Sequence, residues 1–135
     1  MTVISFNFTK ITAERSKGTK GKLNISNNIS IKDIKSFDLQ LGKNKEKALR
    51  FNFKFEAVYD PKIGNIELLG EITYIGKEKE IKDAEKQWKK DKKIPKNIVE
   101  EIMSNILSKC NIEALLMSKE IGLPPPIPLP KVKSN

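Results

Sequence analysis

The chain of 135 residues contains no histidine. This absence removes the side chain most often used as a general base near neutral pH and the commonest ligand of transition metals. The sequence also lacks the patterns GxxxxGKS, GxxxxGKT and GxGxxG, whose glycines form phosphate-binding loops. We therefore expect a protein that is not an enzyme, with no catalytic residue, no metal and no cofactor.

Cysteine and long apolar runs are almost as scarce. Cys110 is the only cysteine, so the chain forms no internal disulfide and fits a reducing compartment. It lies in the apolar stripe of a predicted helix, where a thiol is usually a packing residue rather than a nucleophile. No run approaches the roughly 18 apolar residues of a membrane span. Residues 1–10 also lack the basic and then apolar pattern of a secretory signal. We expect a cytoplasmic protein without a membrane span.

Arginine is rare, although charge is plentiful. Lys and Arg total 26 against 17 Asp and Glu, a formal net charge of +9, yet Arg15 and Arg50 are the only arginines. A basic chain suggests a nucleic-acid partner, but phosphate recognition relies on the planar fork of arginine, which lysine lacks. High lysine content is also typical of an AT-rich genome or a thermophilic source such as an archaeon. We interpret the charge mainly as a solvated surface. Nucleic acid stays the second partner class, carried by lysine-dense segments at 17–22, 43–47 and 89–96.

Alternating apolar residues predict several strands. Residues 4–8 alternate with period two until the pattern slips at Lys10–Ile11, where a bulge would restore the register. The apolar pairs within 23–31 are interrupted by two asparagines. They fit either one bulged strand or a small two-stranded ribbon.

The clearest strands form a hairpin. Phe51, Phe53 and Phe55 alternate with polar residues in the segment 49–56, and a second alternating segment follows at 66–74. The sequence DPKIG between them has a proline and a glycine where a turn requires them. An RNA-binding sheet carries aromatic residues on its open face, but three phenylalanines on one face also need a cover of helices. We expect this face to be core.

Two helices are predicted after the strands. Residues 77–93 are highly charged, with one thin apolar stripe that includes Trp88. A longer helix begins at Pro95 and ends at Gly122. Its apolar residues cover more than one face, which fits either one continuous helix or two segments with Asn111 as the cap of the second.

The order of these segments predicts an α+β domain. We expect an antiparallel sheet of four or more strands, covered on one face by the C-terminal helices. Residues 1–135 would form one domain, with the sheet at 3–76, the helices at 77–121 and a proline-rich extended tail at 122–135.

The tail cannot be helical, because five of the eight residues at 123–130 are proline. An extended segment of this kind loses little entropy on docking, so we expect it to lie along a surface. Pro125 and Pro128 match the PxxP spacing of ligands of SH3-type domains, but the match is weak. We favour packing on the body of the same subunit or on a sister subunit.

The segments ISFNFTKI, FNFKFEAVY, GNIELLGEITYIG, IPKNIVEEIMSNIL and LPPPIPLPKV follow one another along the chain. In order and motif they resemble the SecB family of export chaperones. The resemblance implies the SecB fold and a cytoplasmic, ATP-independent chaperone (a holdase) that binds unfolded or pre-secretory polypeptides in apolar grooves. It also implies a role in protein transport and a homo-oligomer, either a dimer or a tetramer built as a dimer of dimers.

The charge departs from the pattern of the family, whose well-known members are acidic. The resemblance is therefore to a divergent, basic member. General client holding or a toxin–antitoxin setting fits such a chain better than delivery to an export motor.

By the same resemblance, clients would contact apolar side chains between the sheet, the longer helix and the tail. The candidate contact residues are Trp88, Ile98, Ile102, Leu115, Leu116 and Leu123. The alternative function is a basic RNA- or ribosome-associated binding protein.

Overall fold

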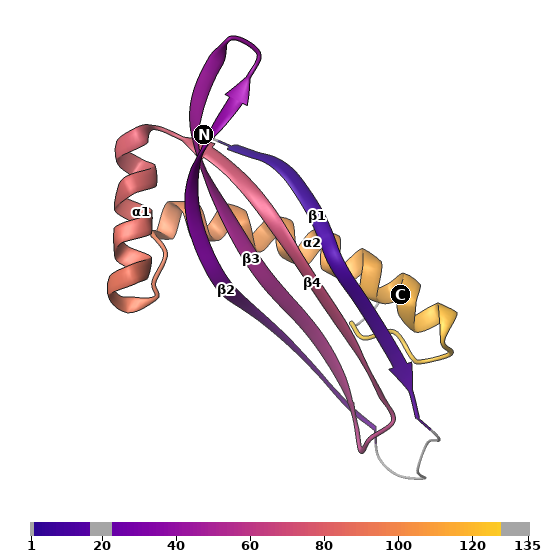
Figure 1. The fold of residues 1–135 in the computed structure, drawn as a ribbon. Coiled ribbons are helices and arrows are strands. Elements are labelled where there is room, and N and C mark those ends of the chain that lie inside the picture. The colour runs from indigo at the N-terminus through magenta and orange to yellow at the C-terminus, as the bar shows by residue number, and fades with distance from the viewer. Residues whose placement is uncertain (1, 17–22, 128–135) are drawn as a thin grey trace, which may run out of the picture.

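The computed structural model describes residues 2–16 and 23–127. Strands occupy the first part of the chain and helices the second (Figure 1). The elements are β1 (Thr2–Arg15), β2 (Asn24–Leu41), β3 (Asn44–Asp60), β4 (Gly64–Gly76), α1 (Glu78–Asp91) and α2 (Lys96–Glu120). The expected α+β fold with its helices last is confirmed.

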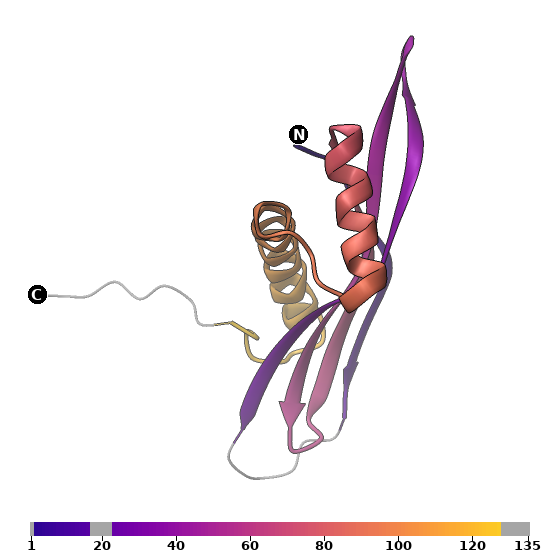
Figure 2. The ribbon, with the colours of Figure 1, turned by 90° about the vertical axis from the view of Figure 1, so that its left-hand side faces the viewer.

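The strands form one antiparallel sheet in the order β1-β4-β3-β2. The sheet is long and twisted, and both helices lie on the same face of it (Figure 2). The expected hairpin is confirmed, because β3 and β4 pair without a register shift. β1 pairs with β4 through two register shifts, one between Val3 and Ser5 and one between Phe8 and Lys10. The second lies one position before the slip that the sequence predicts. The turn end of the β2–β3 hairpin projects beyond the helices (Figure 2).

β2 is one continuous strand with a bulge, which decides between the two interpretations of its apolar pairs. The register shifts between Ile31 and Asp33, so the extra residue is Lys32 and not one of the two asparagines. Ile31 and Ile34 are three residues apart, yet both lie opposite phenylalanines of β3. The extra residue therefore keeps both isoleucines on the face that the helices cover.

The helix-covered face of the sheet is the core. Phe51, Phe53 and Phe55 are at most 1% exposed, which confirms that this face is buried rather than open to RNA. Gly70 of β4 lies opposite Phe53. A Cβ built on Gly70 would lie 2.5 Å from the Phe53 ring and 2.6 Å from the carbonyl oxygen of Asn7. The missing side chain at Gly70 therefore provides the space that the ring occupies.

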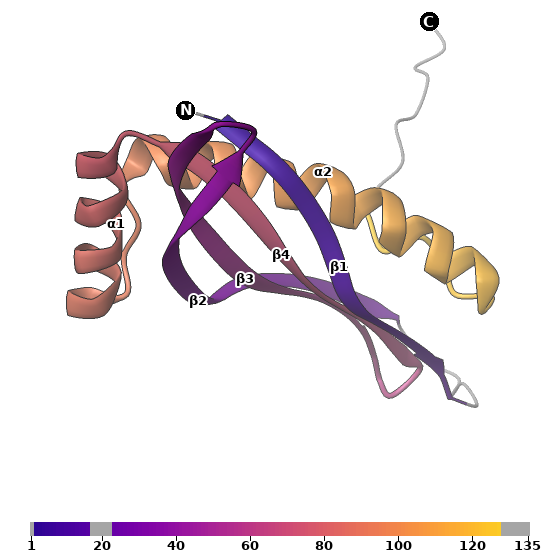
Figure 3. The same cartoon turned by 45° about the horizontal axis from the view of Figure 1, so that its top comes forward.

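α2 is one uninterrupted helix of 25 residues. Asn111 lies inside it, which excludes the alternative of two segments, and Pro95 directly precedes the first turn as the N-cap. Four residues turn an α-helix by about 400°, so a row with this spacing drifts around the helix by about 40° per step. Because of this drift, an unbroken helix has apolar residues on more than one face. The row can stay on the sheet because α2 crosses the sheet obliquely (Figure 3). The buried row consists of Ile98, Ile102, Ile106, Cys110, Ala114 and Ser118.

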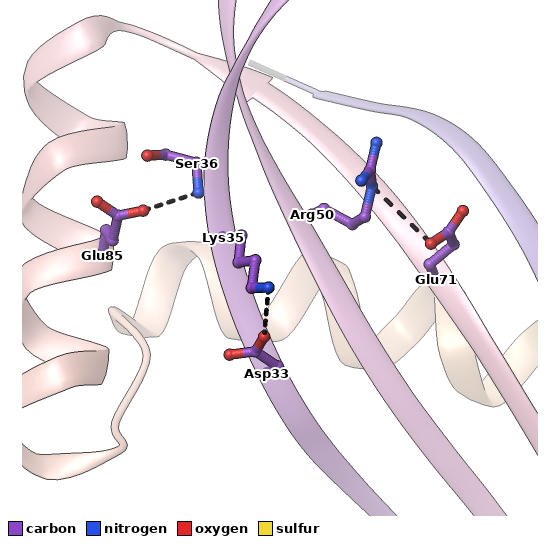
Figure 4. A network of polar contacts seen from close by, with 6 residues as sticks. All are labelled: Asp33, Lys35, Ser36, Arg50, Glu71 and Glu85. Carbon is purple, nitrogen blue, oxygen red and sulfur yellow. Dashed lines mark hydrogen bonds and ion pairs between the residues drawn. The ribbon is translucent and has the colours of Figure 1, made fainter.

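Polar contacts fasten the outer parts of the fold (Figure 4). The carboxylate of Glu85 in α1 accepts a hydrogen bond from the backbone N–H of Ser36 in β2 at 2.8 Å. On the other face of the sheet, Arg50 pairs with Glu71 at 3.9 Å. Glu71 thus lies on a polar face that is open to solvent, as the alternation of β4 predicts.

Candidate functional site

The tail lies against the sheet of its own chain. The side chain of Leu123 is buried. The hydroxyl of Tyr59 in β3 donates a hydrogen bond to the carbonyl oxygen of Pro124 at 2.6 Å. The side-chain amide of Asn27 in β2 donates to the carbonyl oxygen of Pro126 at 3.0 Å. Packing of the tail on its own body is therefore confirmed for the part that the structure describes.

Both hydrogen bonds end on backbone carbonyl groups, which every residue carries. Burial raises the pKa of Tyr59 to about 12, so its hydroxyl stays protonated and able to donate at neutral pH. Tyr59 and Asn27 can therefore hold an extended chain largely without regard to its side chains. Pro128 of the PxxP match and the lysines at 17–22 lie outside the described residues.

α2 carries a second apolar row beside its buried row. Val99, Met103, Leu107 and Leu115 each follow a residue of the buried row by one position, so they form a second row that drifts around α2 beside the first. Leu107 is 44% exposed and the other three are half-buried. At its start this row borders β2, because Val99 and Ile31 line the same cleft. We call these four residues the α2 flank, an apolar row that remains partly exposed to solvent in the single chain.

The cleft lies at the start of the α2 flank, where α1, α2 and β2 meet. Its volume is about 510 Å³, and the Nζ atom of Lys92 lies 5.1 Å from the centre of the Trp88 ring. That distance allows a cation–π contact, which holds the lysine at the rim. We call it the Trp88 cleft. It is lined by Ile31, Lys32, Trp88, Lys92, Ile94 and Val99.

Three of the six predicted contact residues are interior. Ile98 and Ile102 are 0% exposed and belong to the buried row of α2. Leu123 is buried as the anchor of the tail. These three residues support the surface from below, and a client could reach them only if α2 or the tail moved.

The other three predicted contacts have exposed atoms but do not form one patch. Trp88 lines the cleft with 8% of its surface exposed. Leu115 belongs to the α2 flank. Leu116 is 51% exposed and points away from the sheet, because the next position on an α-helix is rotated by about 100°. Contact between a client and each of these residues stays a prediction.

The remaining five residues of the Trp88 cleft were not among the predicted contacts. The sequence holds one signal for them, since the apolar spacing changes from two to three between Ile31 and Ile34, as a bulge at Lys32 requires. Lys92 has a positive φ of 59°, a conformation that lysine adopts rarely and that its sequence neighbours do not signal.

Within residues 2–16 and 23–127, no group of three or more Cys, Asp and Glu side chains is placed to hold a metal ion. In the same part of the chain, neither helix has the length and apolarity to cross a membrane. Burial raises the pKa of the Cys110 thiol to about 12, so this group is protonated and packs in the core.

These elements define a four-stranded antiparallel sheet with two C-terminal helices on one face and an extended tail across it. No family model and no curated protein matches the sequence. Among solved structures, the chain is similar to the SecB-like chaperone Rv1957 of Mycobacterium tuberculosis, determined in complex with a ChAD peptide from the Rv1956 HigA1 antitoxin. The TM-score is 0.55 at 8% identity, over 98% of this chain and 91% of that chain. At this identity the similarity shows a shared fold, and the expected SecB-like architecture is confirmed.

Proposed function

We propose that the protein is an ATP-independent holdase that binds unfolded or pre-secretory polypeptides in the cytoplasm. The observation that carries the proposal is the partly exposed α2 flank, which runs from the Trp88 cleft along the helix. Exposed apolar rows of this kind mark surfaces that bind another chain. The shared fold with a chaperone that was solved with a bound peptide supports the same reading.

The tail indicates how a client would lie. It is an extended segment whose carbonyl oxygens accept hydrogen bonds from Tyr59 and Asn27. An unfolded client presents the same carbonyl groups, with its apolar side chains available to the α2 flank. In this arrangement Leu107 and Leu115 contact the client, and Trp88 contacts it at the cleft.

Self-association belongs to the proposal. Ile112 and Leu116 lie on the solvent side of α2 and are 61% and 51% exposed. Contact between subunits through such residues would remove apolar surface from water at about 25 cal/mol per Å². A dimer or tetramer is therefore the expected state, and the mass in solution measures it directly.

Suppression of aggregation tests the proposed function. A chemically unfolded, aggregation-prone client is diluted into buffer with increasing amounts of the protein, and light scattering is followed. We expect suppression near equimolar ratio without ATP. We expect Leu107→Ser to weaken it by about fivefold or more, since one exposed apolar contact is lost.

Leu41→Ser is the matched control. Leu41 is 43% exposed, nearly the same as Leu107, but it lies at the turn end of the β2–β3 hairpin, beyond the helices (Figure 2). This variant should act like the wild type. Absence of suppression by the wild-type protein at several-fold excess would overturn the proposal.

RNA binding is the second candidate function, motivated by the lysine-dense segments. The described segments do not form one surface, because the β2–β3 turn lies at one end of the molecule and the C-terminal end of α1 lies away from it, beside the middle of the sheet (Figure 2). RNA bound through lysine contacts would dissociate steeply as salt is added, since bound phosphates release counterions. If the protein does not bind single-stranded RNA at low salt, this candidate function is excluded.

A further inference from the structure

Two backbone irregularities place lysines at the rim of the Trp88 cleft. Lys32 is the extra residue of the β2 bulge, and bulges change the direction in which a side chain points. Lys92 follows α1 in the left-handed conformation, with φ 59° and ψ 30°, and its N–H donates to the carbonyl of Trp88 at 2.9 Å. Lys32 and Lys92 come from elements far apart in the sequence, and both line the same cleft.

The charges of these lysines are not neutralised by a neighbour. Lys32 and Lys92 are exposed, and within residues 2–16 and 23–127 neither forms an ion pair. The nearest acidic residues in sequence are engaged elsewhere. Asp33 pairs with Lys35 at 3.8 Å, and a carboxylate oxygen of Asp91 accepts a hydrogen bond from the backbone N–H of Lys93 at 3.1 Å.

The cleft between the two lysines is apolar. Trp88 and three aliphatic residues line it together with Lys32 and Lys92, and its volume of about 510 Å³ exceeds that of any single side chain. A cleft that is apolar inside and positive at its rim complements an apolar group with a negative charge beside it. Unfolded polypeptides supply this combination wherever Leu, Ile or Phe stands next to Asp or Glu.

We propose that the Trp88 cleft binds an apolar side chain of a polypeptide in which the neighbouring residues are acidic. Lys32 and Lys92 then attract the carboxylates of those neighbours. This inference rests on the proposed function, because it names the class of client segment that the holdase selects. The preference arises from rim charges in contact with water. We therefore expect about a three- to tenfold difference in affinity, the size that exposed ion pairs allow.

Trp88 reports binding directly, because it is the only tryptophan in the chain and lines the cleft. Three tryptophan-free peptides share one central leucine and differ only in its neighbours, which are Glu, Gln or Lys. Each is titrated against the full chain while Trp88 fluorescence is recorded. We expect the Glu peptide to bind tightest and the Lys peptide weakest, and the difference to shrink at high salt.

Charge variants assign the preference to the rim. Lys32→Glu combined with Lys92→Asp should reverse the order of the peptides, and aspartate tolerates the left-handed conformation at position 92. Lys109→Glu changes the net charge by the same amount per site at an exposed position of α2 outside the cleft lining. This control should keep the wild-type order. Circular dichroism of each variant verifies that it is folded.

The outcomes separate this inference from the proposed function. Suppression of client aggregation together with equal binding of the three peptides, or with tightest binding of the Lys peptide, overturns the inference and leaves the holdase in place. Retention of the wild-type order by the reversed variant also overturns it. A single-stranded RNA that changes Trp88 fluorescence when no peptide does overturns the inference in favour of nucleic acid. Failure to suppress aggregation, with no peptide bound, overturns both.

Discussion

The hydroxyl of Tyr59 and the carbonyl oxygen of Pro124 are 2.6 Å apart, and this contact joins a central strand to the proline-rich tail. Tyr59 is otherwise enclosed in the core, with no exposed surface. A buried hydroxyl needs a partner, since an unsatisfied one costs about 1–3 kcal/mol. The tail supplies that partner, so the order of the tail and the packing of β3 depend on one another.

Tyr59→Phe removes this hydrogen bond and keeps the ring. We expect the free energy of unfolding to fall by about 1 kcal/mol, and the tail to become more susceptible to limited proteolysis because one of its two hydrogen bonds to the sheet is lost. Urea unfolding and the rate of tail cleavage measure the two effects. Tyr74→Phe is the control, because its hydroxyl donates to Glu80 at 3.0 Å and not to the tail. Equal tail cleavage in the two variants would contradict the expected role of Tyr59.

A methyl group at Gly70 tests the packing of the aromatic core. Gly70→Ala would place a Cβ within 2.6 Å of both the Phe53 ring and the Asn7 carbonyl oxygen, and backbone cannot move aside as a flexible side chain can. We expect a loss of about 1–3 kcal/mol of unfolding free energy, the usual cost of overpacking.

Gly76→Ala is the matched glycine substitution on the same strand. Its nearest contacts would lie at 3.4 Å, an ordinary van der Waals distance, so we expect a much smaller change. Thermal unfolding of both variants provides the measurement. A Gly70→Ala protein as stable as the Gly76→Ala protein would show that the close packing around Gly70 is not required.

The fold was predictable from the sequence where local patterns and tertiary structure agree. Alternation in β3 and β4, with a proline and a glycine in the turn between them, predicts the hairpin because each strand presents one apolar face. α2 was harder to interpret at Asn111. An apolar row with a spacing of four drifts around the helix, and in the sequence that drift resembles a break.

The binding surface was predictable only in part, because it depends on contacts between distant elements. Trp88 stands out in the sequence as a lone aromatic residue in a charged helix. Lys32 and Lys92 look like ordinary solvated lysines, and only the bulge and the left-handed turn bring them to one cleft. Ile98 and Ile102 share the apolar pattern of the α2 flank, and the burial that separates core from surface follows from how α2 crosses the sheet.

The contact between Glu85 and Ser36 predicts a pH dependence. The hydrogen bond from Ser36 lowers the pKa of Glu85 from its ordinary value of 4.5. A carboxyl group whose pKa is lower in the folded state stabilises the fold fully above its unfolded pKa, and this contribution is lost as the pH falls through the folded value. We expect Glu85→Gln to be less stable than the wild type at pH 7, and the difference to shrink below about pH 4.

Urea unfolding at neutral and acidic pH measures this difference. Glu78→Gln is the control, because Glu78 forms an exposed ion pair with Lys82 at 3.1 Å and such pairs contribute little. A difference between wild type and Glu85→Gln that stays constant from pH 7 to acid would show that the charge of Glu85 does not stabilise the attachment of α1 to β2.

Truncation after Gly122 tests whether the tail and a client compete for the same donors. Without the tail, Tyr59 and Asn27 lose the carbonyl groups of Pro124 and Pro126 and become available to a client. If the proposed function holds, we expect the truncated chain to be less stable and to bind an extended peptide more tightly than the full chain. Fluorescence titration measures the affinity, and light scattering measures the mass in solution. Tighter binding at unchanged mass assigns the tail to competition with the client. A fall in mass without tighter binding would show instead that the tail holds subunits together.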